Sequence, residues 1–480
     1  MPVATRRLHE SKLGGIAADR RLRHLEASLA KQLDELLLTA DRPTICAFGG
    51  SQMKKVVLAY SGGLDTSVAV AWLREQYDVE VVTLTVDLGG GVLKEDVDRR
   101  AISAGAARAY VVDGRDRFVR DFCWPHVQAG ALYQGVYPLA TAMARPLIAQ
   151  LLVEVAHKEG ADAVAHGCTG KGNDQVRFDV ATHALDPSLA VIAPMRVGMG
   201  LSREQEIEYA TARNIEITIT KESIYSTDVN LWGRSIEAGI LEDPWTAPRE
   251  DVYKWTVDPD KAPAAVEIII GFEGGVPVSL DGERLDAVTL VEKLHDLAAA
   301  HGVGRVDHVE DRLVGIKSRE IYEAPAAIVI HRAHRSLEGL TLSKDTLRFN
   351  RIVADEIAQL TYDGLWFSAL HRDLRGYAAS SQRVVSGDVR IRLDHGNAIA
   401  VGRRSPLSLY DKGLATYEAD DTFDHASAVG FIEIFGLPLR TEAARHGAVG
   451  RHHGAAWTWT DPLLDDLPTK IYDAPTSALK

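Results

Sequence analysis

Between residues 53 and 222, short apolar runs alternate with longer stretches of helical periodicity. Residues 56–60 (VVLAY) are typical of a strand buried on both faces of a parallel sheet, and a glycine-rich turn and a helix at 66–76 follow. Further strands are expected at 81–87, 110–112, 161–166 and 189–193, and further helices at 95–104, 141–159 and 203–213. This alternation predicts an α/β domain with an open parallel sheet over residues 53–222.

The pattern changes after about residue 222. Apolar runs flank glycine turns at 266–280, around Gly274-Gly275, and at 389–401, around Gly396, and both patterns predict β-hairpins. Helical periodicity lies between them, at 286–301 and 345–362. We therefore predict a second, α+β domain over residues 223–437.

The two ends of the chain fall outside this organisation. Residues 1–52 place several leucines near one helical face, but they lack the continuous apolar segment of a secretory signal, and they carry too many acids for a transit peptide. We interpret 1–52 as a loosely ordered N-terminal extension or a segment upstream of a working start at Met53, with a partner-binding helix as the alternative. Residues 438–480 are expected to form a C-terminal arm that packs on a neighbour or is loosely ordered.

Composition and charge narrow the function classes. The chain has 480 residues, a length that by itself suggests about three domains. With 54 basic and 67 acidic residues its net charge is −13, which argues against a broad basic surface for nucleic acid. It has no apolar run of roughly 18 residues, so no membrane span is expected. Three scattered cysteines favour a reducing, cytoplasmic location and argue against a structural zinc site.

The strongest local signal is the heptad SGGLDTS, from Ser61 to Ser67, directly after the first predicted strand. A Gly-Gly turn lets backbone N–H groups approach an anion, and the N-terminus of the following helix adds positive dipole. The expected ligand is a phosphate chain, although no Walker A sequence occurs. The alternative is an ordinary glycine turn with Asp65 or Thr66 capping a helix.

A second glycine-rich segment, AHGCTGKGND at 165–174, follows the fourth predicted strand. Asn173 and Asp174 suit the charged ends of an amino acid, and Lys171 and Arg177 suit carboxylate or phosphate. The alternative is a flexible polar loop. Because parallel strands end at the same sheet edge, two such loops favour one shared site.

Two further residues in this segment invite catalytic roles. His166 is interpreted as a residue at the strand end that supports the site, in preference to a catalytic base. Cys168 has no histidine that the sequence places beside it, so we interpret it as a loop residue and not as a nucleophile.

These segments together closely resemble the argininosuccinate synthase family, of the N-type ATP pyrophosphatase group. The heptad and the two residues before it match the phosphate-binding loop of the group, which several enzymes share. Segments particular to this family are matched at 166–178, 230–235, 239–244, 302–305 and 317–325. The resemblance covers about residues 53–437, and it implies a Rossmann-like nucleotide-binding domain, a synthetase domain that also mediates oligomerisation, and a homotetramer.

The resemblance also implies a reaction. ATP, citrulline and aspartate give argininosuccinate, AMP and pyrophosphate through a citrullyl-AMP intermediate, with Mg²⁺ accompanying ATP, in arginine biosynthesis and urea-cycle chemistry. No enzyme nucleophile or resident metal is required, so catalysis is expected to come from alignment and from stabilisation of phosphate charge.

Residue roles transfer by the same resemblance. ATP is expected at Ala59, Tyr60, Ser61, Gly62, Gly63, Leu64, Asp65, Thr66, Ser67, Val86 and Gly167. Aspartate is expected at Thr169, Asn173 and Asp174, with Asp174 pairing with the substrate ammonium. Citrulline is expected at Tyr137, Asn173, Arg177, Ser226, Ser235, Glu310 and Tyr322.

The chain departs from the family pattern at two positions, and three rival functions remain to be weighed. Gly90 stands where the family often has Gln, and Ala142 replaces a Ser of some members, a contact that Thr141 could supply. An amidotransferase such as GMP or asparagine synthetase would need a glutaminase segment, and a tRNA-thiolating enzyme would need paired cysteines and a basic face. A non-catalytic nucleotide sensor would not need the polar residues of a second ligand's site.

Overall fold

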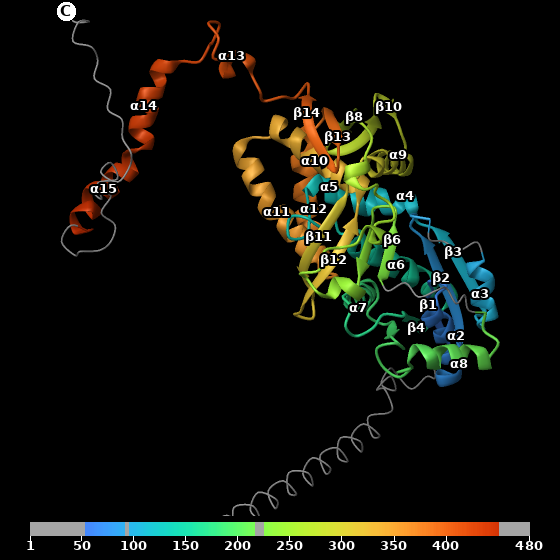
Figure 1. The fold of residues 1–480 in the computed structure, drawn as a ribbon. Helices are drawn as coiled ribbons and strands as arrows, with labels where there is room; N and C mark the ends of the chain where they lie inside the picture. Colours follow the sequence, from blue (N-terminus) through green and yellow to red (C-terminus); the bar gives the residue numbers. More distant parts are fainter. Residues whose placement is uncertain (1–52, 92–95, 217–224, 451–480) are drawn as a thin grey trace, which may run out of the picture. The chain divides into compact units, whose positions relative to one another are not determined.

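The computed structural model describes residues 53–91, 96–216 and 225–450, and the predictions made for residues 1–52 and beyond 450 lie outside these ranges. The chain divides into two compact units, one ending at Leu409 and the other beginning at Tyr410 (Figure 1). None of the described helices is both long enough and apolar enough to cross a membrane.

The first unit begins with the predicted parallel sheet. Its strands are β1 (Lys55–Ala59), β2 (Glu80–Asp87), β3 (Arg108–Asp113), β4 (Ala163–Ala165) and β5 (Ala190–Ile192). They pair in parallel in the order β3-β2-β1-β4-β5, which confirms all five predicted strands. Because the strand order reverses at β1, the carboxyl ends of β1 and β4 frame the crevice where such sheets bind ligands.

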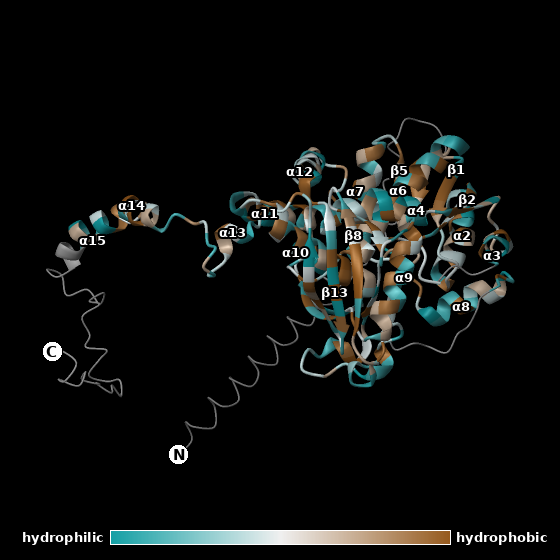
Figure 2. Cartoon of the chain, turned by 90° about the horizontal axis from the view of Figure 1, so that it is seen from above, coloured by the Kyte–Doolittle hydropathy of each residue, from teal (hydrophilic) through white to brown (hydrophobic). Residues whose placement is uncertain are grey.

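Helices cover both faces of this sheet, as the unbroken apolar runs of its strands require. Val56 and Leu58 of β1 pack in an apolar cluster with one set of helices, whereas Val57 packs in the cluster on the opposite face. The first set is α2 (Leu64–Tyr77), α3 (Val97–Ser103) and α8 (Arg203–Ala212), and α6 (Ala140–Glu159) covers the other face. The four predicted helices are therefore confirmed. In Figure 2 the brown colour of apolar residues runs along β1.

A five-stranded antiparallel sheet follows later in the chain. Its strands, in the order β10-β9-β8-β13-β14, are β8 (Val266–Glu273), β9 (Val276–Leu280), β10 (Glu283–Arg284), β13 (Gly387–Asp394) and β14 (Asn397–Arg404). Both predicted hairpins are confirmed, and Gly274 and Gly275 have the positive φ values, 57° and 79°, that a tight hairpin turn requires. The accompanying helices are α9 (Ala287–Ala300), α10 (Pro325–Thr341), α11 (Lys344–Tyr362) and α12 (Ala369–Ser381). α9 and α11 were predicted, and α10 and α12 were missed.

A second antiparallel sheet was also missed. It contains β6 (Ser226–Asn230), β7 (Gly233–Glu237), β11 (Arg305–Asp311) and β12 (Lys317–Glu323) in the order β11-β12-β7-β6. These strands are rich in charged residues, so they lack the apolar alternation by which strands are recognised. The polar face that hid them from the sequence pattern is the one that builds the site described below.

One apolar core joins the parallel sheet to the later elements. Its members include Val57 of β1, Trp232 in the turn after β6, and Leu294 of α9. Trp232 is 1% exposed, and its indole N–H donates to the carbonyl of Pro138 (3.1 Å), which ties that turn to the segment before α6. The domain boundary placed at 222/223 stays a prediction.

The second unit contains α13 (Lys412–Ala415), α14 (His425–Phe435) and α15 (Leu437–Gly450). Asp424 caps the N-terminus of α14 by accepting from the backbone N–H groups of Ala426 and Ser427. The apolar side chains of α14 are exposed, among them Phe431 at 63% and Ile434 at 75%. Figure 2 accordingly shows much of α14 in brown.

Candidate active site

The glycine-rich turn between β1 and α2 has a conformation that only glycine adopts easily. Gly62 has φ 72°, and a Cβ atom there would lie 2.5 Å from Nη2 of Arg100. That guanidinium, on α3, donates to the carbonyl of Gly62 (2.5 Å). Gly63 has an ordinary φ of −82°, and a Cβ there would meet only Oγ of Ser61 at 3.4 Å. The first glycine is therefore required by the backbone and by its neighbour, and the second is not.

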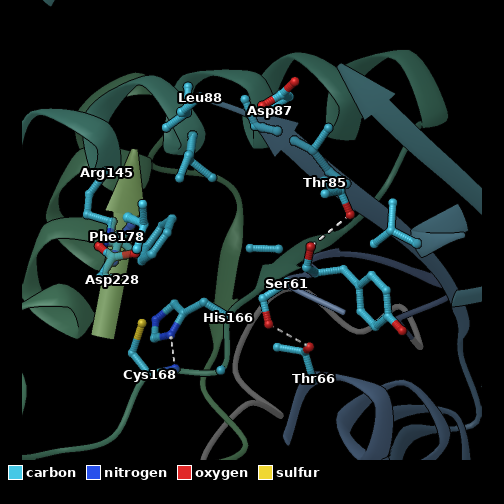
Figure 3. A pocket seen from close by; sticks show the side chains of 18 of the residues that line it. Ser61, Thr66, Thr85, Asp87, Leu88, Arg145, His166, Cys168, Phe178 and Asp228 are labelled. Carbon is cyan, nitrogen blue, oxygen red and sulfur yellow. Dashed lines mark hydrogen bonds and ion pairs between the residues drawn. The ribbon is translucent and has the colours of Figure 1, made fainter. Parts of the chain in front are cut away.

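Hydroxyl groups brace this turn from within. Oγ of Ser67 donates to the carbonyl of Gly63 (2.8 Å) and shares a hydrogen bond with the hydroxyl of Tyr60 (2.8 Å). Oγ of Ser61 lies 3.1 Å from Oγ1 of Thr66. Ser67 is 3% exposed and supports the turn from behind, whereas Ser61 and Thr66 face the adjoining cavity (Figure 3).

That cavity has a volume of about 300 Å³ and lies at the carboxyl ends of β1, β2 and β4 (Figure 3). Six of the eleven residues predicted for ATP line it: Ala59, Tyr60, Ser61, Thr66, Val86 and Gly167. The other five, which do not line it, are Gly62, Gly63, Leu64, Asp65 and Ser67. The walls are largely apolar, with Leu84, Ile148 and Phe178 among them. We call this space the nucleotide cavity.

His166 and Cys168 also line the nucleotide cavity, and their surroundings favour supporting roles. His166 is 1% exposed; its Nδ1 accepts from the backbone N–H of Cys168 (3.2 Å), and its Nε2 lies 2.8 Å from Oδ1 of Asp179. Both ring nitrogens are thus engaged. Burial, with the nearby carboxylate of Asp174, raises the pKa of the Cys168 thiol to about 12, so that this thiol is not a nucleophile at neutral pH.

Arg145 of α6 connects the nucleotide cavity to a second cavity. Its Nη2 donates to Oδ2 of Asp174 (2.8 Å) and to Oδ2 of Asp228 on β6 (2.6 Å). Sequence reasoning missed Arg145 and Asp228. A signal for Arg145 was available, because it is a lone cation among the apolar residues that begin α6. Asp228 carried no comparable signal, since its strand was not recognised.

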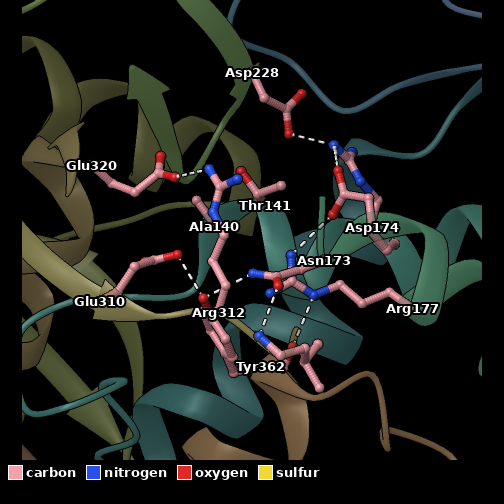
Figure 4. A network of polar contacts seen from close by, with 12 residues as sticks. Ala140, Thr141, Asn173, Asp174, Arg177, Asp228, Glu310, Arg312, Glu320 and Tyr362 are labelled. Atoms are coloured by element: carbon pink, nitrogen blue, oxygen red, sulfur yellow. Dashed lines mark hydrogen bonds and ion pairs between the residues drawn. The ribbon is translucent and has the colours of Figure 1, made fainter. Parts of the chain in front are cut away.

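The second cavity, of about 110 Å³, has one face of the four-stranded sheet as a wall, and Tyr137, Thr141, residues 172–174, Arg177 and Tyr362 line its other sides (Figure 4). The sheet register pairs Asp228 with Ser235, and Ser235 with Tyr322, so one row across β6, β7 and β12 faces it. Eight predicted or suggested residues line it, namely Tyr137, Thr141, Asn173, Asp174, Arg177, Ser235, Glu310 and Tyr322. We call this space the amino-acid cavity; it shares Asp228 with the nucleotide cavity.

Two of the residues predicted for aspartate and citrulline line neither cavity. Thr169 is exposed in the loop after β4, and Ser226 is exposed at the start of β6, on an edge strand. Ala142 is fully buried, whereas Thr141 beside it lines the amino-acid cavity. Gly90 has φ 77°, and a Cβ there would lie 2.7 Å from Cγ1 of Val229, so a side chain at this position would be strained and would displace its neighbour.

Three tyrosines and Glu310 line one side of the amino-acid cavity. The rings of Tyr137 and Tyr322 stack with centroids 3.9 Å apart. Glu310 accepts from the hydroxyls of Tyr322 and Tyr362, both at 2.6 Å. Burial raises the pKa of both tyrosines, so they stay hydroxyl donors at neutral pH.

A further group of charges that the sequence did not reveal lines the same cavity. Nη2 of Arg312, which follows β11, donates to Glu237 and to Oε1 of Glu320 (2.8 Å). Burial, together with the neighbouring Glu237, raises the pKa of Glu320 to about 9. Asp174 behaves oppositely: burial acts to raise its pKa, but the guanidinium groups of Arg145 and Arg177 outweigh burial and lower it to about 2.

Two comparisons with known proteins, one with family models and one with individual relatives, bear on this site. A family model described as the arginosuccinate synthase N-terminal HUP domain matches residues 55–216, and one described as the C-terminal domain of the same enzyme matches residues 225–442. Argininosuccinate synthase of Dehalococcoides mccartyi is 54% identical over 391 residues, covering 81% of this chain and 96% of the relative. Those of Symbiobacterium thermophilum and Rubrobacter xylanophilus are each 55% identical, covering 82% and 81% of this chain and 98% and 94% of the relatives.

Proposed function

The chain belongs to the argininosuccinate synthase family, and from that premise we propose which residues carry the reaction. The enzyme is an ATP-dependent ligase that joins citrulline to aspartate in arginine biosynthesis. The observation that carries the assignment of residues is the pair of adjoining cavities. One is bordered by a glycine turn suited to phosphates and the other by paired charges suited to amino acids, and Asp228 belongs to both.

In this proposal ATP occupies the nucleotide cavity. The triphosphate lies against the turn formed by Tyr60–Gly63 and the N-terminus of α2, where backbone N–H groups and the hydroxyls of Ser61 and Thr66 donate to it. Val86 and Gly167 contact the adenosine. Supporting this arrangement, the turn ends at the switch point of the parallel sheet, and its glycine carbonyl is held by Arg100.

Citrulline and aspartate share the amino-acid cavity. Citrulline is assigned to Tyr137, Asn173, Arg177, Ser235, Glu310 and Tyr322, and aspartate to Asn173 and Asp174. Thr169, predicted for aspartate, and Ser226, predicted for citrulline, lie outside the cavity and would have to move toward the substrates. Arg145 is a further candidate for a substrate carboxylate. Supporting these assignments, a guanidinium of the site and a carboxylate of the site can each pair with one charged end of an amino acid.

The chemistry needs no enzyme nucleophile. The ureido oxygen of citrulline attacks the α-phosphorus of ATP, the bond to pyrophosphate breaks, and citrullyl-AMP forms. The amine of aspartate then attacks the ureido carbon, and AMP leaves as argininosuccinate forms. The protein aligns the three substrates and stabilises the phosphate charge, and the protonated thiol of Cys168 is consistent with a reaction that uses no thiolate.

We propose that Mg²⁺ enters with ATP. Among the described residues, no three histidine, cysteine or acidic side chains converge to hold a metal ion by themselves. Asp87 and Asp228 nevertheless place carboxylates on the wall of the nucleotide cavity. Mg²⁺ is usually bound through one or two carboxylates and the phosphates of its nucleotide, so these two residues suit it. The ion would neutralise charge on the triphosphate.

We further propose that the enzyme is a cytoplasmic homotetramer, with nucleotide binding in residues 53–222 and the synthetase domain in residues 223–437. The free thiols of Cys123 and Cys168 fit a reducing compartment. The exposed apolar side chains of α14 fit contact with another copy of the chain. Ile434→Glu in the full chain should then give smaller assemblies in sedimentation velocity, and unchanged sedimentation would contradict this use of α14.

Product analysis tests the function. Purified protein with MgATP should release AMP and pyrophosphate at full rate only when both citrulline and aspartate are present. Release of ADP, or turnover without citrulline, would contradict the proposal. If the ureido oxygen of citrulline carries an isotope label, the appearance of that label in AMP would report the adenylate step directly.

A further inference from the structure

Tyr362 is the last residue of α11. It is one of the residues that line the amino-acid cavity, and it touches three of the residues assigned to citrulline (Figure 4). Its hydroxyl donates to Oε1 of Glu310 (2.6 Å) and accepts from Nδ2 of Asn173 (2.8 Å). Its carbonyl accepts from Nε of Arg177 (2.9 Å). Tyr362 therefore contacts a strand of the four-stranded sheet, the N-cap residue Asn173 of α7 (Asp174–Leu185), and Arg177 within that helix.

These contacts settle which atoms remain for substrate. Asn173 donates one amide hydrogen to Tyr362, and its Oδ1 accepts from the backbone N–H of Leu313 (3.0 Å). Arg177 uses Nε for Tyr362 and Nη1 for Asp174 (2.9 Å). Its Nη2 has no hydrogen bond to the residues that the structure describes and can meet a substrate carboxylate. Glu310 is held on one oxygen by Tyr362 and on the other by Tyr322. Without the Tyr362 hydroxyl, the Glu310 carboxylate would be held only by its hydrogen bond from Tyr322 and could rotate.

Several contacts hold Tyr362 itself in place. Its ring stacks on Tyr133 with centroids 3.7 Å apart, and Cζ of Arg177 lies 4.9 Å from its ring centroid. The residue is 1% exposed, and α11 packs beside α5 (Trp124–Ala129) and α6 in the apolar core. Because the whole ring is buried and closely packed, the hydroxyl group of Tyr362 is held in one position.

We propose that Tyr362 is a positioning residue that orients Glu310, Asn173 and Arg177 for citrulline. The inference rests on the proposed function, because it takes those three residues as the citrulline site. The hydroxyl of Tyr362 matters for binding because a carboxylate, an amide and a guanidinium must all point into one small cavity at once. Its ring and carbonyl serve packing and the placement of Arg177.

Tyr362→Phe tests the proposal, since it removes the hydroxyl and keeps the stacked ring and the carbonyl. We expect the KM for citrulline to rise about tenfold or more, with a smaller change in kcat, because two polar groups lose their partner. The KM for ATP should stay within about twofold. The matched control is Tyr133→Phe, which removes a hydroxyl from the other ring of the same stack; that hydroxyl donates to the carbonyl of Asp311 (2.9 Å). It should leave all three KM values within about twofold.

A double-mutant cycle separates this inference from the proposed function. Glu310→Gln should raise the KM for citrulline, and Tyr362→Phe combined with it should add less than its effect in the wild type. If Glu310→Gln raises that KM and Tyr362→Phe does not, the positioning role is wrong and the residue assignment survives. Parallel rises in all three KM values with a lowered unfolding temperature would show a merely structural role. No effect of Glu310→Gln would overturn the assignment and the inference together.

Discussion

The nucleotide cavity and the amino-acid cavity share a wall, yet they are built from different kinds of structure. The nucleotide cavity lies at the end of a parallel sheet, where backbone N–H groups of a turn and apolar side chains form the contacts. The amino-acid cavity lies on the face of an antiparallel sheet, where charged side chains are already paired with one another.

The difference indicates two ways of holding a charged ligand in an acidic protein. At the turn, the backbone supplies fixed donors that carry no net charge, so the conformation of one glycine is decisive. On the sheet face, each guanidinium and carboxylate is stabilised by its partner before substrate arrives, as the lowered pKa of Asp174 records. Substitutions in the nucleotide cavity should therefore act mainly on ATP, and substitutions in the amino-acid cavity on citrulline or aspartate.

The largest effect is expected from Asp174→Ala in the amino-acid cavity. The substitution removes a carboxylate that we assign to the aspartate ammonium, and it leaves Arg145 and Arg177 without a shared partner. A hydrogen bond to a charged group contributes about 1.5–3 kcal/mol, so the KM for aspartate should rise roughly 10–100-fold. The KM for citrulline should rise less. Steady-state kinetics with each substrate varied in turn measures both.

Asp179→Ala is the matched control for that substitution. Asp179 lies one turn or more further along α7, pairs with His166 and Arg196, and lines neither cavity. It should leave the ratio of the aspartate and citrulline KM values unchanged. Equal rises in the two KM values for Asp174→Ala would show that the aspartate assignment is wrong.

A smaller effect, confined to the nucleotide cavity, is expected from Gly62→Ala. The left-handed conformation costs an L-residue about 1–2 kcal/mol, and the new methyl group would meet Arg100. We expect the KM for ATP to rise roughly tenfold, with the two amino-acid KM values little changed. Gly63→Ala is the control, because Gly63 has a negative φ and a Cβ atom there would make only an ordinary contact with Oγ of Ser61. If both variants behave alike, the turn does not depend on its glycine conformation.

The smallest effect is a change in how stability depends on pH, produced by Glu320→Gln. The folded state keeps a proton on Glu320 that the unfolded state releases, so stability should fall as pH rises from about 4.5 to about 9. Glutamine removes this dependence, and the citrulline KM should change only slightly because it mimics the protonated acid. Thermal unfolding of both proteins across that pH range measures the difference.

Glu323, on the same strand but facing away, is a control with the opposite sign. Burial acts to raise its pKa, but donors from Lys254, Trp255 and Thr256 outweigh burial and lower it. Glu323→Gln should therefore destabilise the protein at neutral pH, and this loss should diminish as pH falls through the lowered pKa. A parallel pH response of the two variants would contradict the assigned directions.

Much of the parallel-sheet half was predictable. Strands that are buried on both faces must be apolar throughout, and glycine turns and helical periodicity separate them, so β1 to β5 and their main helices follow from local pattern. The family resemblance then placed Asn173, Arg177 and Glu310 in one site. The four-stranded sheet escaped prediction because its strands carry the charges of the site, and this removes the apolar alternation that identifies a strand.

The sequence by itself determined the family, the reaction and the turn at Gly62, because these depend on contiguous residues and on backbone conformations that few side chains allow. Only the tertiary structure decided that Arg145 joins the two cavities, that Asp228, Ser235 and Tyr322 form one row, and that Tyr362 reaches Glu310. Arg145 and Tyr362, the two that are farthest apart in the sequence, are separated by 217 positions. Their meeting depends on strand register and on the packing of α6 and α11, which no local pattern records.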